Sequence, residues 1–129
     1  MIRVLVVLMS VLPVVASAQE AFQLPSGNIH CMLFEGRLRC DILQFNFPRP
    51  PRPRGCTEDW GDAVEIGARG PAVFLCHGDT VANPQAPFLQ YGTAWQGPCM
   101  SCTAAQTGLR CVNGEGRGFE ISRARVRVF

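Results

Sequence analysis

The chain has 129 residues, and its twelve basic residues, all arginine, stand against ten acidic residues to leave a net charge of +2. A charge this close to neutral gives no electrostatic basis for a nucleic-acid or anionic-membrane partner. With 47% hydrophobic residues and no sustained helical period, the composition favours a folded protein that is all-β or nearly so.

The first eighteen residues have the organisation of a cleavable secretory signal peptide. Arg3 supplies a positive charge, Val4 to Ala16 is almost unbroken apolar sequence, and Ala16-Ser17-Ala18 has the small-x-small form that signal peptidase reads. The apolar run is shorter than the roughly 18 residues that a membrane-spanning helix needs, and Pro13 interrupts it. We therefore predict a signal peptide over 1–18, cleavage before Gln19 and no membrane span in the mature form.

Cleavage at this point leaves 19–129 as a single disulfide-rich β domain of 111 residues (129 minus 18), exported and either periplasmic or secreted. Its seven cysteines predict a disulfide framework, as is usual for small exported domains. Zinc is the alternative for such a count, but only Cys99 and Cys102 have the close C-x-x-C spacing. We expect no metal and no cofactor.

The mature chain opens with short predicted strands. Phe22 to Leu24 and Gly27 to Leu33 read as strands, Glu35-Gly36 as a two-residue hairpin loop, and Arg37 to Leu43 as the returning strand.

The spacing of two cysteines supports this hairpin. Counting outward from the Glu35-Gly36 loop, Cys31 faces Cys40 in a non-hydrogen-bonded pair, where Cα atoms approach to about 4.5 Å. That separation suits a disulfide, so the spacing predicts both the hairpin and a bridge between Cys31 and Cys40.

The middle of the chain alternates between stiff connectors and short strands. Phe47 to Arg54 is rich in proline and predicts extended polyproline II, and Thr57 to Ala63 is compatible with one helical turn. A bridge between Cys56 and Cys76 would pin the proline-rich crossing to the second of two apolar strands. These two predicted strands are Ala63–Ile66 and Ala72–His77.

The C-terminal part repeats the cysteine spacing of the first hairpin. Cys102 and Cys111 are again nine residues apart, which predicts a second hairpin with its loop within Ala105 to Gly108 and its own bridge. The remaining strand candidates are Phe88–Tyr91, Thr93–Trp95, Arg117–Arg123 and Ala124–Phe129. Together these elements predict a compact sandwich or partly closed barrel of antiparallel hairpins, with at most one short helix.

Motifs spread over nearly the whole mature chain occur in a specific order. They are Phe22-Gln23-x-Pro25-Ser26-Gly27-Asn28-Ile29-x-Cys31, Asp59-Trp60-Gly61, Cys76-x-Gly78-Asp79-Thr80-Val81, Tyr91-Gly92, Gly108-Leu109-x-Cys111-x-Asn113 and Gly116-x-Gly118-Phe119-x-Ile121-Ser122-Arg123. In this order they resemble a family of small exported bacterial proteins catalogued as a domain of unknown function, numbered 6636. The resemblance implies export and three intradomain disulfides, with Cys99 outside the six-cysteine pattern. It implies no catalytic or binding residue.

Cys99-Met100-Ser101-Cys102 is the sharpest enzyme-like signal, because a C-x-x-C dithiol can be redox active. The interpretation we favour pairs Cys102 with Cys111 and leaves Cys99 over, so we expect a monomer or a dimer linked through Cys99. If Cys99 is instead bridged to Cys102, a thiol–disulfide oxidoreductase is the alternative function.

A second enzyme hypothesis is a small hydrolase. His77-Gly78-Asp79 places an imidazole near a carboxylate, and Ser26 or Ser101 would complete a triad, although no Gly-x-Ser-x-Gly elbow is present. A run of acids reads more simply as a solvated turn than as a glycosidase pair or a calcium loop. Its members are Glu58, Asp59, Asp62 and Glu65.

Arg49, Arg52 and Arg54 lie among prolines and are the candidate partner-binding residues, because pre-ordered polyproline II docks partners and arginine binds carboxylates and phosphates in bidentate fashion. Our leading hypothesis is an exported, non-enzymatic envelope or extracellular binding module, with enzyme inhibition as one version. Its partner would be an envelope or extracellular protein or a glycan. We lean against an enzyme and name no catalytic residue.

Overall fold

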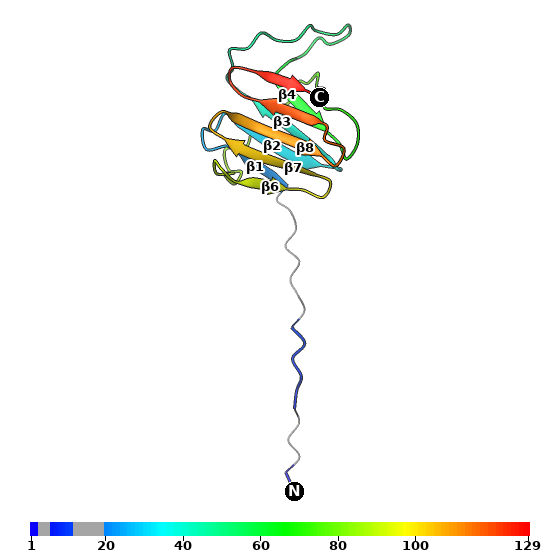
Figure 1. The fold of residues 1–129 in the computed structure, drawn as a ribbon, viewed down its shortest axis with the longest axis vertical. Coiled ribbons are helices and arrows are strands. Elements are labelled where there is room, and N and C mark those ends of the chain that lie inside the picture. Colours follow the sequence, from blue (N-terminus) through cyan, green and yellow to red (C-terminus); the bar gives the residue numbers. More distant parts are fainter. Residues whose placement is uncertain (3–5, 12–19) are drawn as a thin grey trace.

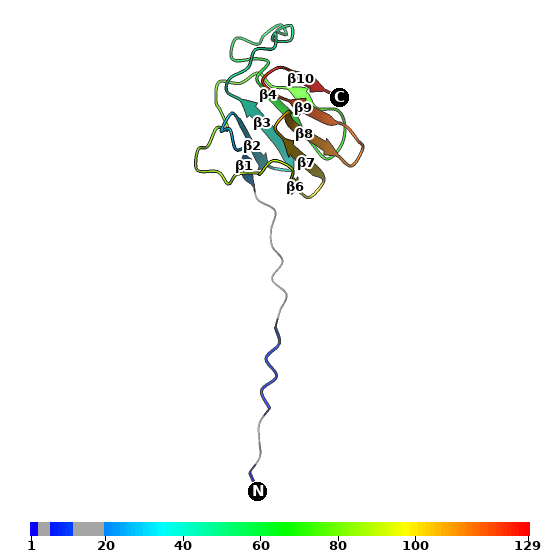
Figure 2. The same cartoon turned by 60° about the vertical axis from the view of Figure 1, so that its left-hand side comes forward.

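The computed structural model describes residues 1–2, 6–11 and 20–129. Within these ranges the chain forms ten strands and no helix, arranged as two five-stranded antiparallel sheets that pack face to face (Figures 1 and 2). The expectation of a disulfide-stapled all-β sandwich is confirmed, and the two sheets do not join into a closed barrel. Most of the signal peptide predicted over 1–18, and its cleavage point, lie outside the described residues.

The first sheet is a simple meander in which each strand pairs with the next along the chain. Its strands are β1 Ala21–Gln23, β2 Ile29–Phe34, β3 Arg37–Ile42, β4 Ala63–Ile66 and β5 Val73–Phe74. The second sheet is also a meander. Its strands are β6 Ala94–Gln96, β7 Met100–Ala105, β8 Gly108–Asn113, β9 Gly118–Ile121 and β10 Val126–Val128.

The two sheets are structural repeats of one another. In each, the central hairpin carries a cross-strand disulfide, Cys31–Cys40 with Cα atoms 4.1 Å apart and Cys102–Cys111 with Cα atoms 4.0 Å apart. Both cysteines of the second pair lie 71 residues after their counterparts in the first (102 minus 31 and 111 minus 40). The repeated spacing in the sequence therefore marks a repeat of the whole five-stranded unit.

The core lies between the sheets and contains both hairpin disulfides, whose cysteines are at most 1% exposed. The aromatic residues opposite each bridge meet there. Phe22 faces Cys31 in the first sheet and Trp95 faces Cys102 in the second, with the two ring centroids 5.3 Å apart. Since alternate residues of a strand point to opposite faces, each strand's remaining residues form the outer face of its sheet.

The hairpin loop at Glu35-Gly36 has the predicted length. Both residues have positive φ, 50° and 75°, as a type I′ turn requires. Glycine adopts this region freely, whereas glutamate there is uncommon. The loop sets the register that places Cys31 opposite Cys40, as expected from the spacing.

Three predicted elements are wrong in part. No helical turn forms over Thr57 to Ala63, because Gly61 has φ 94° and the backbone of Asp59 exchanges two hydrogen bonds with that of His77. Both arrangements are incompatible with a helix. Phe88 to Tyr91 makes a single bridge to Gln23 rather than a strand, and the strand expected over Ala72 to His77 is reduced to β5.

Two long connections distinguish the first half from the second. The proline-rich segment between β3 and β4 extends beyond the ends of the strands, drawn in teal to green in Figure 1. The connection from β5 to β6 runs along the first sheet and pairs with β1, since the backbone of Gln23 bonds to Pro87 and Leu89. Among the described residues, no helix is long and apolar enough to cross a membrane.

Candidate functional site

A row of buried polar side chains crosses the outer face of the first sheet. Gln23, His30 and Asp41 are cross-strand neighbours on β1, β2 and β3, and each is at most 3% exposed. Outward positions of a sheet are ordinarily solvated, and burying a polar group there requires hydrogen-bond partners. All three side chains find those partners in the 79–89 part of the β5–β6 connection.

Asp41 fixes the beginning of this connection. Its carboxylate accepts two hydrogen bonds from Arg39, at 2.8 and 3.0 Å, one from the Thr80 hydroxyl at 3.2 Å and one from the backbone amide of Val81 at 3.1 Å. Arg39 also donates to the carboxylate of Asp79, which lowers the pKa of Asp79. One buried carboxylate thereby orients both an arginine and a loop.

His30 and Gln23 hold the rest of the connection. The Nδ1 atom of His30 accepts a hydrogen bond from the backbone amide of Asn83, so its Nε2 carries the proton and donates to the Gly27 carbonyl. The side-chain amide of Gln23 donates to the carbonyl oxygens of Pro84 and Ala86 at 3.0 and 2.8 Å. The 79–89 segment is thus a fixed wall on the sheet.

An open groove of about 670 Å³ lies between this wall and the β2–β3 hairpin, and we call it the outer groove. Its floor carries two large apolar side chains, Met32 at 37% and Phe34 at 64% exposure. Charged residues of both signs surround them, with Arg37 paired to Glu65. The full lining is Met32, Phe34, Glu35, Arg37, Arg39, Glu65 and Asp79 to Asn83.

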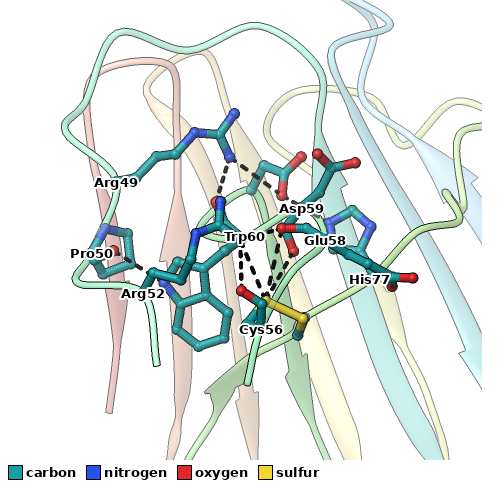
Figure 3. Close-up of a disulfide and its surroundings, with 10 residues drawn as sticks. Arg49, Pro50, Arg52, Cys56, Glu58, Asp59, Trp60 and His77 are labelled. Carbon is teal, nitrogen blue, oxygen red and sulfur yellow. Dashed lines mark hydrogen bonds and ion pairs between the residues drawn. A yellow bond between two sulfur atoms is a disulfide. The ribbon is translucent and has the colours of Figure 1, made fainter. Parts of the chain in front are cut away.

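Two of the three candidate partner-binding arginines, Arg49 and Arg52, are exposed but form hydrogen bonds to backbone carbonyls of the segment that follows them. Arg49 donates to the backbone carbonyl of Trp60, and Arg52 donates to the carbonyl of Glu58 and to that of Cys56 at 3.3 Å (Figure 3). These contacts close the proline-rich segment on itself.

The Trp60 indole and the Cys56–Cys76 disulfide also hold the proline-rich segment in place. The indole N–H donates to the Pro50 carbonyl at 3.1 Å, and the Cys56–Cys76 disulfide ties the base of the segment to the strand end after β5 (Figure 3). All three candidate arginines are exposed, and Arg54 differs from the other two because the described residues give its side chain no hydrogen-bond partner.

His77 is a buried clamp. Its Nδ1 lies 2.6 Å from the Asp79 backbone carbonyl and its Nε2 lies 2.8 Å from Oδ1 of Asp62. Both neighbours are hydrogen-bond acceptors, which favours a proton on each ring nitrogen. Burial lowers the pKa of His77, but the hydrogen bonds to Asp62 and to the Asp79 carbonyl outweigh it, so the pKa is raised.

This geometry does not support the hydrolase hypothesis. Both ring nitrogens of His77 are engaged, and the Asp79 carboxylate is held by Arg39 rather than by the imidazole. Ser101 is on β7 of the second sheet, and Ser26 is in the β1–β2 turn. Neither serine has a hydrogen bond to His77 within the described part of the chain.

The cysteines form the pairs Cys31–Cys40, Cys56–Cys76 and Cys102–Cys111, the three expected. Cys99 is free and exposed in the turn between β6 and β7. Because Cys102 is buried and bridged to Cys111, the C-x-x-C motif is not a dithiol pair in this state, which removes the geometric basis for an oxidoreductase.

The acidic run is dispersed by the fold. Asp62 contacts His77, Glu65 pairs with Arg37 across the outer face, and Asp59 takes part in a backbone bridge. Across the described residues, no group of three or more potential metal ligands comes together.

Sequence reasoning missed the outer groove and the polar row beside it. The predicted hairpin register already contained a signal, because one position outward from Cys31 and Cys40 it places His30 opposite Asp41. A histidine and an aspartate that face each other beside a buried disulfide indicate that another segment of the chain covers this part of the sheet. That pattern does not predict which segment covers it, because the covering loop lies some forty residues away in the sequence.

A comparison with known protein families identifies a match. Residues 37–129 match the model of DUF6636, described as a family of unknown function. No curated protein and no solved structure matches the chain significantly.

Proposed function

Because this chain belongs to DUF6636, a family of unknown function, its role has to be argued from its own surface, and we propose an exported, non-enzymatic binding module whose ligand site is the outer groove. The observation that carries the proposal is the exposure of Phe34 and Met32 on the floor of a groove whose wall is fixed by buried hydrogen bonds. Large apolar side chains exposed together in a concave site are typical of ligand-binding surfaces.

Export is supported by the disulfide content and by the signal-peptide pattern of the first eighteen residues. Three disulfides in a small domain stay oxidised outside the cytoplasm, where thiol reductants do not act on them. We propose the periplasm or the extracellular space as the site of action.

The groove favours an extended polypeptide as its ligand. Its apolar floor offers room for one or two hydrophobic side chains, while Arg37, Glu65 and Asp79 supply charges of both signs at the rim. Backbone amides and carbonyls of a peptide can pair with such mixed charges, whereas a purely ionic ligand would be repelled by half of them. Since the wall is fixed before binding, little loop ordering opposes association.

The test uses a defined probe, a random heptapeptide phage library panned on the mature protein. We expect enriched peptides that share a hydrophobic anchor, and roughly tenfold or greater loss of their affinity in Phe34→Ser, as for a hot-spot side chain. Leu43→Ser is the matched control, because Leu43 is 51% exposed and does not line the groove. Absence of a common anchor, or equal losses in the two variants, would contradict the proposal.

A further inference from the structure

The second sheet differs from the first in charge. Residues 20–93 contain six arginines against eight acidic residues, a net charge of −2, while 94–129 contain five arginines against two glutamates, a net charge of +3. The near-neutral total therefore hides an acidic half and a basic half. Each half corresponds to one of the two repeated sheets.

Three arginines of the basic half converge on a single carboxylate. The side chains of Arg110, Arg125 and Arg127 donate to Glu120 at 3.1, 3.3 and 3.3 Å. Arg110 and Glu120 are cross-strand neighbours, and Arg127 faces Glu120 from β10, so Arg110, Glu120 and Arg127 lie on the outer face of the second sheet. Arg125 reaches the same carboxylate from the turn between β9 and β10. We call this cluster the arginine face.

Comparison with the equivalent positions of the first sheet shows that the arginine face is unusually exposed. Arg39 and Glu65 occupy in the first sheet the positions that Arg110 and Glu120 occupy in the second. Arg39 is neutralised by Asp41 and Asp79, and its side chain is only 14% exposed.

In the second sheet the position equivalent to Asp41 is Val112, 71 residues later. Among the described residues Arg110 therefore pairs with Glu120 alone. The side chain of Arg110 is 50% exposed, against 54% for Arg127 and 73% for Arg125. Three guanidinium groups share one carboxylate, which leaves a local excess of two positive charges on an open sheet.

These arginines are also held in position. The guanidinium carbons of Arg110 and Arg127 lie 5.2 and 4.7 Å from the ring centroid of Phe129, within the range of cation–π contact. Glu120 forms ion pairs with the same two guanidinium groups. A fixed guanidinium loses less freedom when it binds an anion than a free one does, and it can bind carboxylate, sulfate or phosphate with two parallel hydrogen bonds.

A shallow cavity of about 270 Å³ adjoins the cluster and adds hydroxyl groups. Thr103, Thr107 and Ser122 line it together with Arg110 and Arg125. Hydroxyls beside guanidinium groups match a ligand that has both neutral hydroxyls and regularly spaced anionic groups. Such a chemical pattern is that of an acidic sugar chain.

We propose that the arginine face binds an anionic polysaccharide, with Arg110, Arg125 and Arg127 contacting its sulfate or carboxylate groups and the threonine hydroxyls contacting its sugar hydroxyls. This site is independent of the outer groove, which is on the opposite sheet. Either proposal can fail without the other.

The experiment measures affinity of the mature protein for heparin, for polygalacturonic acid and for neutral dextran at several salt concentrations. We expect binding to the two acidic polymers, which distinguish sulfate from carboxylate, and none to dextran. Binding should weaken as salt rises, because counterions are released from the polymer.

Two double variants locate the site. Arg125→Gln with Arg127→Gln should weaken binding by roughly tenfold at about 0.05 M salt and flatten the salt dependence. Arg69→Gln with Arg117→Gln removes the same charge from exposed positions that form no ion pair with Glu120 and do not line the cavity, and should leave binding unchanged. Thermal unfolding of both variants checks that the fold is retained.

Three outcomes would overturn the proposal. One is binding to neither acidic polymer, and a second is an equal loss in the two double variants, which would indicate net charge rather than a site. The third is binding to vesicles of phosphatidylglycerol with no binding to either polysaccharide, which would make the face a membrane-surface contact.

Discussion

At the scale of single residues, buried polar side chains hold the connections between strands in place. Gln23, His30, Asp41 and His77 are each at most 7% exposed, and each bonds to the backbone of a connection rather than to another strand. No buried side-chain nitrogen or oxygen lacks a partner in the described residues. Since an unpaired polar group costs about 1–3 kcal/mol in such a place, these bonds select one conformation of each loop.

The clamp at His77 predicts a pH dependence of stability. Its pKa is raised in the folded protein above the ordinary value of 6.5, so the folded state binds a proton more tightly than the unfolded state does. A group of this kind contributes stability in full below its unfolded pKa and loses that contribution as pH rises through the folded pKa. The stability difference between the wild type and His77→Gln should therefore shrink as pH rises above about 6.5.

Urea unfolding of both proteins at a series of pH values measures this difference. Asp62→Asn is the second variant, because it removes the carboxylate that Nε2 faces while leaving the imidazole in place. We expect the Asp62→Asn variant to lose most of the pH dependence of stability that the wild type shows. A difference that stays constant with pH, or grows, would show that the imidazole is neutral in the folded protein.

At the scale of elements, the two central hairpins are the most strongly specified parts of the fold. A two-residue loop and a cysteine pair nine residues apart set the register of β2 with β3, and the same spacing sets β7 with β8. Because strand register has period two, a slip of one residue would turn both cysteines away from the core. The bridge and the hydrophobic pattern therefore agree on one pairing.

The hairpin bridges should contribute equally to stability. Each closes a loop of about ten residues, for which the chain-entropy relation gives about 3 kcal/mol. Cys31→Ala with Cys40→Ala, and Cys102→Ala with Cys111→Ala, should each lower the free energy of unfolding by about that amount or slightly more, since small cavities remain.

Equilibrium urea unfolding measures these losses, and Cys99→Ser serves as the control. Cys99 is exposed and unbridged, so its replacement should change the free energy of unfolding by less than about 0.5 kcal/mol. If one hairpin bridge proves far less important than the other, the equivalence of the two sheets as folding units is wrong.

At the scale of the whole molecule, two equivalent sheets present different outer faces. The first is covered by the 79–89 segment and bears the outer groove, and the second is open and bears the arginine face. The difference arises from a few substitutions at equivalent positions, such as Asp41 against Val112, together with one long connection. A duplicated scaffold with two unlike faces is suited to contact two ligands at once.

Export and oxidation can be tested together on the intact protein. We expect the protein produced with residues 1–18 to begin at Gln19, to contain three disulfides and to take up one alkyl group, at Cys99, without denaturant. Intact-mass measurement after alkylation checks all three expectations, and a non-reducing gel detects a dimer linked through Cys99. An uncleaved chain would contradict the proposed export, and labelling at Cys102 or Cys111 would contradict the second hairpin bridge.

The amino-acid sequence by itself determined the fold class, both hairpins, their loops and their bridges. These features depend on residues within about ten positions of one another, so turn chemistry, alternation and cysteine spacing are enough to specify them. Membership of the family was also visible in the order of its motifs, and the matched range confirms it.

Only the tertiary structure decided which polar residues are buried and which surfaces are open. Asp41 and Val81, or Gln23 and Ala86, are 40 and 63 residues apart, and no local pattern indicates that they meet. For the same reason Arg49 and Arg52 bond to backbone carbonyls near them, while Arg110, Arg125 and Arg127 gather around Glu120. Long-range packing sets the partners of a polar side chain, and those partners determine whether it stabilises the fold or remains free to bind.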